Sequence, residues 1–311
     1  MKIESRLAQI GSTKEPGTGA VSYPIYHATA FRHPRLGEST GFDYSRTKSP
    51  TRHVLEEAIA DLEGGDAGFA CSSGMAALQI ALSIFSQGDH LLVSFDLYGG
   101  TYRLLEQVLK RFGIQADYVD TNDLDELNAK KQPNTKAVLI ETPSNPLMLI
   151  TDLAKVCEWA KANQLLTIVD NTLLTPYFQR PIEFGADIVV HSASKYLGGH
   201  NDVLAGLIVT KGEALSEQIA FLHNSIGAVL GPQDSWLLMR GMKTLALRME
   251  KHQENALKIT KYLQSHPMVE KVYYPGLPDH PGYDIQCKQA SGNTGIFSFR
   301  MKDKRTIEPI L

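Results

Sequence analysis

The chain has 311 residues, of which 43% are apolar and 21% are charged, and its formal net charge is −3. That length supports one large or two moderate folded domains. The nearly balanced charge, with no long basic run, gives no support to nucleic acid or an anionic membrane surface as a partner.

No stretch is long and apolar enough to span a bilayer. The N-terminal residues lack the apolar core of a secretory signal. The three cysteines, Cys71, Cys157 and Cys287, are far apart and odd in number, so neither a metal site nor a disulfide framework is predicted. These features favour the cytoplasm as the location.

The first 50 residues are rich in Gly, Pro, Ser and Thr, and we predict an extended arm with little core of its own. The arm leads into FDYSRTKSPTR, residues 42–52, which is unusually aromatic and basic. Side chains of this kind usually pack against another surface, which points to contact with a second subunit.

From residue 51 onward, amphipathic helices alternate with short apolar strands. Helices are predicted over residues 54–63, 75–85, 101–112 and 153–164, and strands over 67–71, 90–94, 114–119, 136–141, 165–170, 187–192 and 204–210. Strands that are apolar along their whole length and separated by helices are typical of a mostly parallel sheet covered on both faces. The predicted fold class is therefore α/β.

After Gly231, one long helical stretch is predicted over residues 233–266, followed by strands within 269–277 and 295–301 and a helix starting within 304–310. We interpret this part as a smaller α/β domain that is incomplete where the sequence stops at Leu311. The predicted division is an N-terminal arm at 1–50, a large cofactor-binding domain at 51–245 and the small domain at 246–311.

The segment HSASKYLGGH, residues 191–200, presents Ser192, Ser194 and Lys195 in one turn after a predicted buried strand. A lysine that is removed from water loses its proton more readily and becomes the amine nucleophile of Schiff-base chemistry. The two hydroxyl groups could bind a phosphate beside it. The alternative is an ordinary surface lysine, which is the commoner situation for this residue type.

Ligands of a doubly wound sheet bind at the carboxyl ends of its strands. Other predicted strands also carry residues at these ends that could bind parts of the same ligand. Gly74 and Met75 open a predicted helix, whose first N–H groups suit a phosphate, although Ser73 there could be an ordinary helix cap. Tyr98 could stack on a planar ring. Arg103 could bind a carboxylate or could face solvent.

Two further strand ends supply an amide and a carboxylate. In ETPSNP, residues 141–146, two prolines make a rigid turn that fixes the direction of Asn145. Asp170 ends a predicted strand, where a carboxylate either caps the next turn or pairs with a protonated ring nitrogen, as in pyridoxal 5'-phosphate (PLP). An amine, a ring partner, an aromatic side chain and a phosphate cradle at successive strand ends together predict a PLP site.

As a set, SSGMAA, YGGTYR, ETPSNP, DNT and HSASKYLGGH resemble the PLP-dependent enzymes of Cys/Met metabolism. The resemblance runs over residues 7–299, nearly the whole chain. It implies the aspartate aminotransferase-like fold, type I of the PLP-dependent transferases, and a trans-sulfuration function in methionine and cysteine biosynthesis. Segments such as DSWLLMRGMKTLALRM resemble most the branch of cystathionine γ-synthase and O-acetylhomoserine thiolyase.

The resemblance also implies roles for individual residues. Lys195 matches the lysine that binds the cofactor covalently and moves protons, Asp170 the partner of the ring nitrogen, and Tyr98 the stacked tyrosine that assists catalysis. Asn145 matches a residue near the cofactor's 3-hydroxyl, and Arg103 one associated with the distal carboxylate of the substrate. The phosphate is bound by residues matching Gly74, Met75, Ser192 and Ser194 and, from a neighbouring subunit, Tyr44 and Arg46. The last pair implies a homodimer with shared active sites, commonly assembled into a homotetramer.

Within the family, formation of cystathionine from an O-acylhomoserine and cysteine is the predicted reaction, with a cystathionine β- or γ-lyase as the alternative. Family members continue past Leu311 with a serine-containing loop and an arginine for the substrate α-carboxylate, so a catalytically impaired PLP-binding fragment is a second alternative. A nicotinamide-dependent oxidoreductase is disfavoured, because Ser-Ser-Gly-Met, residues 72–75, stands where G-x-G-x-x-G would be needed.

Overall fold

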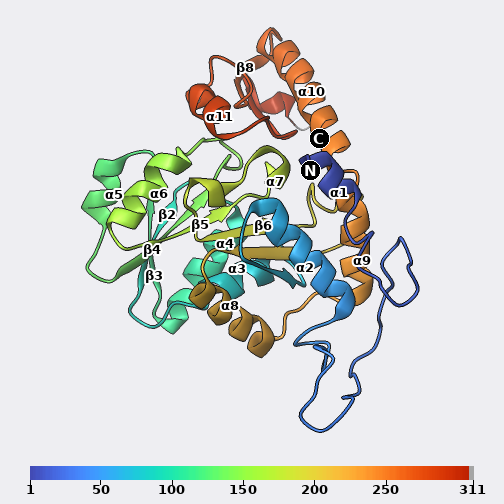
Figure 1. Cartoon of the computed structure of the whole chain (residues 1–311). Helices are drawn as coiled ribbons and strands as arrows, with labels where there is room; N and C mark the ends of the chain where they lie inside the picture. The colour runs from blue at the N-terminus through green and yellow to red at the C-terminus, as the bar shows by residue number, and fades with distance from the viewer. Residues whose placement is uncertain (308–311) are drawn as a thin grey trace.

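The computed structural model of the chain describes residues 1–307, and a seven-stranded sheet lies at its centre (Figure 1). The spatial order of the strands is β1-β7-β6-β5-β4-β2-β3. Their bounds are β1 (Ala67–Cys71), β2 (His90–Ser94), β3 (Gln115–Val119), β4 (Thr135–Glu141), β5 (Leu166–Asp170), β6 (Ile188–Ser192) and β7 (Gly206–Thr210).

All neighbouring strands from β3 to β6 pair in parallel, and β7 runs antiparallel to both β6 and β1. This arrangement confirms the prediction of an α/β fold with a mostly parallel sheet. Its functional consequence is that the carboxyl ends of β2, β4, β5 and β6 lie along one edge of the sheet, so that residues distant in sequence meet there.

The central strands are largely apolar because both faces of the sheet are buried there, and successive residues face opposite cores, whereas the edge strand β3 is partly exposed. On β5, Ile168 packs in the core formed with α3 (Gly74–Leu82) and α8 (Glu213–Ile226). The next residue, Val169, packs in the core formed with α2 (Pro50–Glu63), α6 (Leu153–Ala162) and α9 (Pro232–Met242). Each strand is thereby held between two helical layers.

Two helical predictions differ from the structure in detail. The stretch at 101–112 is α4 (Gly99–Arg103) followed by a π-helical turn (Leu104–Val108) and a 3₁₀ turn (Leu109–Phe112). The stretch at 233–266 is α9 and then α10 (Leu245–Gln264), separated by two residues. Further short helices are α5 (Leu124–Lys130), α7 (Thr175–Phe178), a 3₁₀ turn at Pro181–Phe184 and α11 (Tyr283–Gln289).

The N-terminal segment is only partly the extended arm that the sequence predicts. Residues 29–45 form a loop that projects away from the sheet (Figure 1), closed by backbone bonds such as Ser45 N–H to Thr29 O at 2.8 Å. The first residues instead form α1 (Ile3–Ala8), which buries Leu7 in the large core. A helix this short has too few apolar positions to be recognised from periodicity.

The C-terminal part forms a second, small layer above the sheet (Figure 1). It contains β8 (Val269–Tyr273) paired antiparallel with β9 (Ser298–Met301), together with α11 and the end of α10. Because α10 buries Met249 in the large core and Ala256 in the small one, it belongs to both layers. The domain boundaries at 50 and 245 stay predictions.

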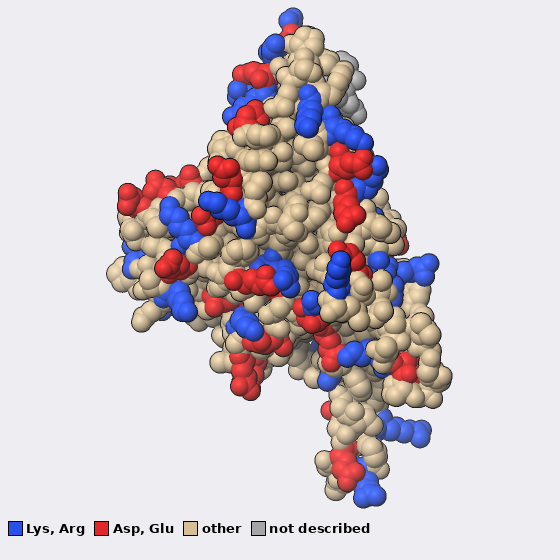
Figure 2. Space-filling view, turned by 45° about the horizontal axis from the view of Figure 1, so that its top comes forward, with Lys and Arg blue, Asp and Glu red and all other residues tan. Residues whose placement is uncertain are grey.

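The helix expected within residues 304–310 is described only as a 3₁₀ turn at Lys304–Thr306, and its remainder lies outside the described residues. Over residues 1–307, no helix combines the length and apolarity needed to cross a membrane. Figure 2 shows acidic and basic side chains interspersed over the visible face, so neither sign of charge dominates that surface.

Candidate active site

Asp170 is the last residue of β5, opposite Glu141 on β4 and Val190 on β6. Its Oδ1 accepts a hydrogen bond from the backbone N–H of Thr172 at 3.0 Å. Burial raises the pKa of Asp170, and the hydrogen bonds from Thr172 and the charge of His191 act against that rise. The carboxyl group therefore lies in the middle of the sheet edge at which ligands of this fold bind.

Glu141 ends the neighbouring strand and holds two of the predicted turns, although the sequence analysis gave it no role. Its Oε2 accepts the backbone N–H of Tyr98 at 2.8 Å, and its carboxyl group also accepts the backbone N–H of Asn145. Burial, and then the nearby charge of Asp170, raise the pKa of Glu141 to about 8. An uncharged carboxyl group therefore anchors both turns at neutral pH.

Replacing Glu141 with glutamine is expected to change how stability depends on pH. Because the pKa of Glu141 in the folded state is raised, the folded chain holds this proton more tightly than the unfolded chain, and stability falls as pH rises from about 4.5 to 8. Glutamine cannot ionise and keeps an acceptor for Tyr98. The free energy of unfolding of the variant, taken relative to that of the wild type, should therefore be higher at pH 8 than at pH 5, by on the order of 2–4 kcal/mol.

Urea unfolding of the cofactor-free protein across this pH range measures the effect. Glu158→Gln, on an exposed position of α6, is the matched control and should run parallel to the wild type. If the stability of Glu141→Gln also ran parallel to that of the wild type over this pH range, Glu141 would be ionised in the folded protein.

The predicted phosphate cradle is formed where α3 begins against the end of β6. A Cβ on Gly74 would lie 2.8 Å from the Cβ of Ser192, so only glycine allows this approach. The first N–H groups of α3 have no partner within the helix, and Ser73 caps the helix by accepting from the backbone N–H of Ala76 at 3.1 Å. The helix cap is therefore confirmed, and phosphate binding at this helix start stays a prediction.

The two serines of the 191–200 segment differ in their surroundings. Ser192 is partly exposed, and its backbone N–H donates to the hydroxyl of Thr172 at 2.8 Å, which joins the ends of β5 and β6. The Ser194 hydroxyl exchanges hydrogen bonds with the backbone of Ala205, at 3.0 Å as acceptor and 3.2 Å as donor. Ser194 thus also fixes the turn to the start of β7.

Lys195 lies in a compact turn that follows β6. Backbone bonds from Gly198 to Ala193 and from Gly199 to Lys195, both 2.8 Å, close the turn, and Arg248 of α10 donates to the carbonyl of Tyr196 at 2.6 Å. The Lys195 side chain is exposed in the single chain, so the burial expected from the preceding strand is not found. The turn carries the lysine beyond the end of the buried strand.

Tyr98 and Arg103 flank the start of α4. The Tyr98 ring lies against Gly100, where a Cβ would come within 2.9 Å of both Tyr98 Cδ1 and the Met75 sulfur. Tyr98 is therefore adjacent to the α3 N-terminus while half of its surface remains exposed, at 50%. Arg103 is exposed near Gly99, and no described contact joins it to Lys195 or Asp170.

Tyr44 and Arg46 are not brought to the sheet edge of their own chain. The Arg46 guanidinium lies over the Tyr44 ring, 5.4 Å from its centroid, and donates to the side chain of Asn224 at 2.8 Å. Asn224 belongs to α8. The chain thus holds both residues at the base of the projecting loop, and their contribution to a neighbouring subunit stays a prediction.

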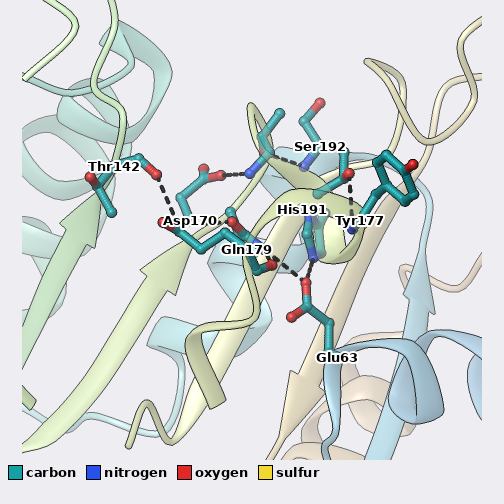
Figure 3. A network of polar contacts seen from close by, with 10 residues as sticks. Glu63, Thr142, Asp170, Tyr177, Gln179, His191 and Ser192 are labelled. Atoms are coloured by element: carbon teal, nitrogen blue, oxygen red, sulfur yellow. Dashed lines mark hydrogen bonds and ion pairs between the residues drawn. The ribbon is translucent and has the colours of Figure 1, made fainter. Parts of the chain in front are cut away.

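A buried polar network, drawn in Figure 3, lies directly behind these strand ends and was not predicted. Glu63, the last residue of α2, contacts His191 and Asn171, and Asn171 exchanges bonds with Gln179. No sequence signal marked it, because a glutamate that ends a helix before two glycines is normally a solvated residue.

Comparison of this chain with known proteins identifies its family. The sequence pattern described as "Cys/Met metabolism PLP-dependent enzyme" matches residues 4–310. The chain belongs to this family. It is 52% identical to the cystathionine beta-lyase of Lactococcus lactis subsp. cremoris (strain MG1363), covering 98% of this chain and 80% of that protein.

Similar relatives differ in the reaction for which they are named. A cystathionine gamma-synthase/O-acetylhomoserine (thiol)-lyase of Bacillus subtilis (strain 168) is also 52% identical, over 99% of this chain and 79% of that protein. The crystal structure of cystathionine gamma-lyase from Lactobacillus plantarum complexed with L-serine superimposes with a TM-score of 0.95 at 52% identity, covering 97% of this chain and 79% of that one.

These similarities confirm the type I PLP-enzyme fold, PLP as the cofactor and a trans-sulfuration enzyme of the cystathionine synthase/lyase type. They exclude the oxidoreductase alternative. The chain spans about four fifths of the length of the relatives it matches.

The described residues fit PLP chemically. The cofactor requires an anion for its ring nitrogen, an anion-binding cradle for its phosphate and an amine for its carbonyl. Asp170 would supply the first, and the N-terminus of α3, where Gly74 closely approaches Ser192, would supply the second. Lys195, which carries the amine, lies in the turn that follows Ser192. Its backbone N–H donates to the Ser192 carbonyl at 3.1 Å, which keeps this turn next to the cradle.

Proposed function

We propose that this trans-sulfuration enzyme forms cystathionine from an O-acylhomoserine and cysteine, as a cystathionine γ-synthase, with O-acetylhomoserine thiolyase activity as a possible second reaction of the same site. The observation that carries the proposal is the 52% identity, over 99% of this chain, to the relative named for both reactions. Cleavage of cystathionine by a β- or γ-lyase is the second candidate, favoured by an equal identity to a named β-lyase.

In this proposal Lys195 would hold the cofactor covalently and would serve as the mobile acid and base that moves protons on the substrate. PLP, when bound, supplies the electron sink for the substrate's reacting carbons. An exposed amine on a turn held by backbone bonds and Arg248 can reach successive substrate carbons while its Cα stays fixed. General acid–base transfer by one positioned group contributes about 10²–10⁴-fold to such reactions.

The other proposed residues orient the cofactor and the substrate. Asp170 holds a proton on the ring nitrogen, and Tyr98, next to the α3 N-terminus, covers the ring and assists deprotonation of the incoming amine. Asn145 lies on the turn anchored by Glu141 and would bind near the cofactor's 3-hydroxyl. Arg103 binds the distal carboxylate of the substrate. The phosphate ligands are Gly74, Met75, Ser192 and Ser194.

We also propose a homodimer whose sites are completed by Tyr44 and Arg46 of the neighbouring subunit, with a homotetramer as the larger assembly. The support is structural: both side chains are exposed, and their own chain holds them at the base of the projecting loop rather than at the sheet edge. A cytoplasmic location stays a prediction from the sequence.

Two incubations test the reaction. With O-acetylhomoserine and cysteine, we expect consumption of both and accumulation of cystathionine and acetate; with cystathionine alone, we expect no release of a thiol, an oxo acid or ammonia. Consumption of cystathionine in the second incubation, without synthesis in the first, would establish the lyase instead. Absence of turnover in both, by protein that binds PLP, would identify a catalytically impaired PLP-binding protein.

A further inference from the structure

Arg52 is a buried arginine in the first turn of α2. Its Nε donates to Glu56 Oε1 at 3.1 Å. Its two Nη atoms serve the backbone of the preceding segment: Nη1 donates to the carbonyl of Ser45 at 2.8 Å, and Nη2 donates to the carbonyls of Arg46 at 3.0 Å and Thr47 at 3.2 Å. One guanidinium group thus binds three consecutive carbonyls.

These carbonyls belong to a helical turn that cannot continue. The backbone N–H of Lys48 donates to the Tyr44 carbonyl at 3.0 Å, which closes the turn. In the same pattern Pro50 would donate to the Arg46 carbonyl, and proline has no N–H. Carbonyls at the end of a helical turn need outside donors. A guanidinium group has five N–H donors in one plane and can serve several carbonyls at once. Arg52 therefore holds the backbone of this turn.

Glu56 ties this contact to the sheet. Its Oε1, which accepts from Arg52, also accepts the backbone N–H of Ala70 in β1 at 3.1 Å. The pair is largely removed from water, with 2% of the Arg52 side chain and 12% of the Glu56 side chain exposed. Breaking such a pair is unfavourable, because it leaves the other charge buried without a partner. The turn is thus linked through α2 to an edge strand of the sheet.

The turn carries the two side chains predicted to serve a neighbouring subunit. Tyr44 and Arg46 are both exposed, and the loop of residues 29–45 that leads into the turn projects away from the sheet (Figure 1). Asn224 of α8 accepts from the Arg46 guanidinium, whereas Arg52 holds the backbone. Ordering one flexible residue on binding weakens affinity by about a factor of ten. A turn that is already held in place avoids this loss.

We propose that Arg52 is a positioning residue for the PLP site of the neighbouring subunit: by holding the carbonyls of residues 45–47, it presents Tyr44 and Arg46 to the phosphate of the cofactor. The proposal rests on the homodimer with shared sites put forward under the proposed function. Arg52 is buried, so it acts on the phosphate only through this turn. Its loss should therefore damage the site of the partner and spare the site of its own chain.

Binding of PLP and of pyridoxal, which lacks the phosphate, shows what Arg52→Gln loses. We expect this variant to bind PLP roughly ten- to hundredfold more weakly, the effect of ordering one or two residues on binding, and to bind pyridoxal like the wild type. Arg300→Gln is the matched control, because Arg300 is an exposed arginine that pairs with Glu270, and both of its dissociation constants should be those of the wild type. Native mass spectrometry should find both variants in the wild-type assembly.

Mixed chains show which subunit's site depends on Arg52. Lys195→Ala chains cannot attach PLP but supply an intact turn, and Arg52→Gln chains supply an intact Lys195. The two are unfolded and refolded together, at a PLP concentration between the dissociation constants of the wild type and of Arg52→Gln. Borohydride reduction and mass spectrometry then measure the cofactor fixed to Lys195.

We expect about half of the Arg52→Gln chains to be loaded in this mixture, because statistical mixing in equal amounts gives half of them a Lys195→Ala partner. Without mixing, few Arg52→Gln chains should be loaded. A mixture of Arg52→Gln with Arg46→Ala should show no gain, because every site in it would receive a damaged turn. Native mass spectrometry confirms that mixed dimers form.

Loading of Arg52→Gln chains that does not rise on mixing with Lys195→Ala would overturn the proposal, because Arg52 would then act within its own chain. An equal loss of affinity for PLP and for pyridoxal, or no loss for either, would overturn it too. Should Arg52→Gln not fold, Arg52→Lys keeps the positive charge beside Glu56 but not the planar group, and it should give the same results.

A parallel mixture of Lys195→Ala with Arg46→Ala separates this role from the shared site on which it rests. If the Arg46→Ala chains gain cofactor on mixing and the Arg52→Gln chains do not, only the role of Arg52 is wrong. If neither variant gains cofactor although mixed dimers form, the shared site is wrong as well.

Discussion

Replacing Lys195 with alanine is expected to abolish covalent binding of PLP and to lower turnover by at least about 10²–10⁴-fold, the usual contribution of a positioned acid–base group. The variant loses both the amine that attaches the cofactor and the group that moves protons on the substrate. Reduction with borohydride followed by mass spectrometry should find the cofactor on the Lys195 peptide of the wild type and on no peptide of the variant.

Two further variants show whether the amine itself is required. Lys195→Arg keeps a positive charge but cannot be deprotonated, so it should be as inactive as the alanine variant. Lys211→Ala removes an exposed lysine that pairs with Asp66, and it should bind the cofactor covalently like the wild type. Covalent cofactor in Lys195→Ala would mean that another lysine is the attachment point.

Mixing Lys195→Ala chains with Arg46→Ala chains is expected to restore activity that neither variant has alone. If each site combines Lys195 of one chain with Arg46 of its partner, half of the dimers formed by statistical mixing contain one intact site, which gives up to about a quarter of the wild-type activity. Activity of the mixture after unfolding and refolding together measures this effect, and native mass spectrometry confirms that mixed dimers form.

A mixture of Lys195→Ala with Asp170→Ala is the matched control. Asp170 ends β5 and Lys195 follows the neighbouring strand β6 of the same chain, so every site of a mixed dimer would lack one of the two, and no activity should return. The intersubunit role of Arg46 is wrong if mixed dimers form and the mixture with Arg46→Ala is equally inactive.

The sequence was sufficient to predict the sheet. The strands of the large domain were predicted to within two residues of their ends, because burial on both faces makes most of them apolar runs that end at a turn. It was also sufficient to predict the order of the strand-end groups along the chain, including Asp170 and the 191–200 turn. These features depend on local composition and on a general rule for parallel sheets.

Predictions that depended on longer-range packing were less successful. The helix of residues 233–266 divides in two between Met242 and Leu245. Near this break, Gly241 approaches the carbonyl of Gly198 in the lysine turn, and Arg248 binds that turn at Tyr196. The exposure of Lys195 could not be deduced from the buried strand before it. Both features depend on how a turn and a helix that are distant in sequence lie together.

By itself, the sequence determined the fold class and the family and predicted which residues would bind PLP, because these follow from apolar patterning and from side-chain chemistry at strand ends. Only the tertiary structure decided where Glu63 is buried and how the pKa of Glu141 is shifted. Glu141 is neutral because it is buried beside Asp170, and Glu63 is buried against His191 because α2 ends behind β5 and β6. Protonation depends on burial and on neighbouring charges, and neither is written in the local sequence.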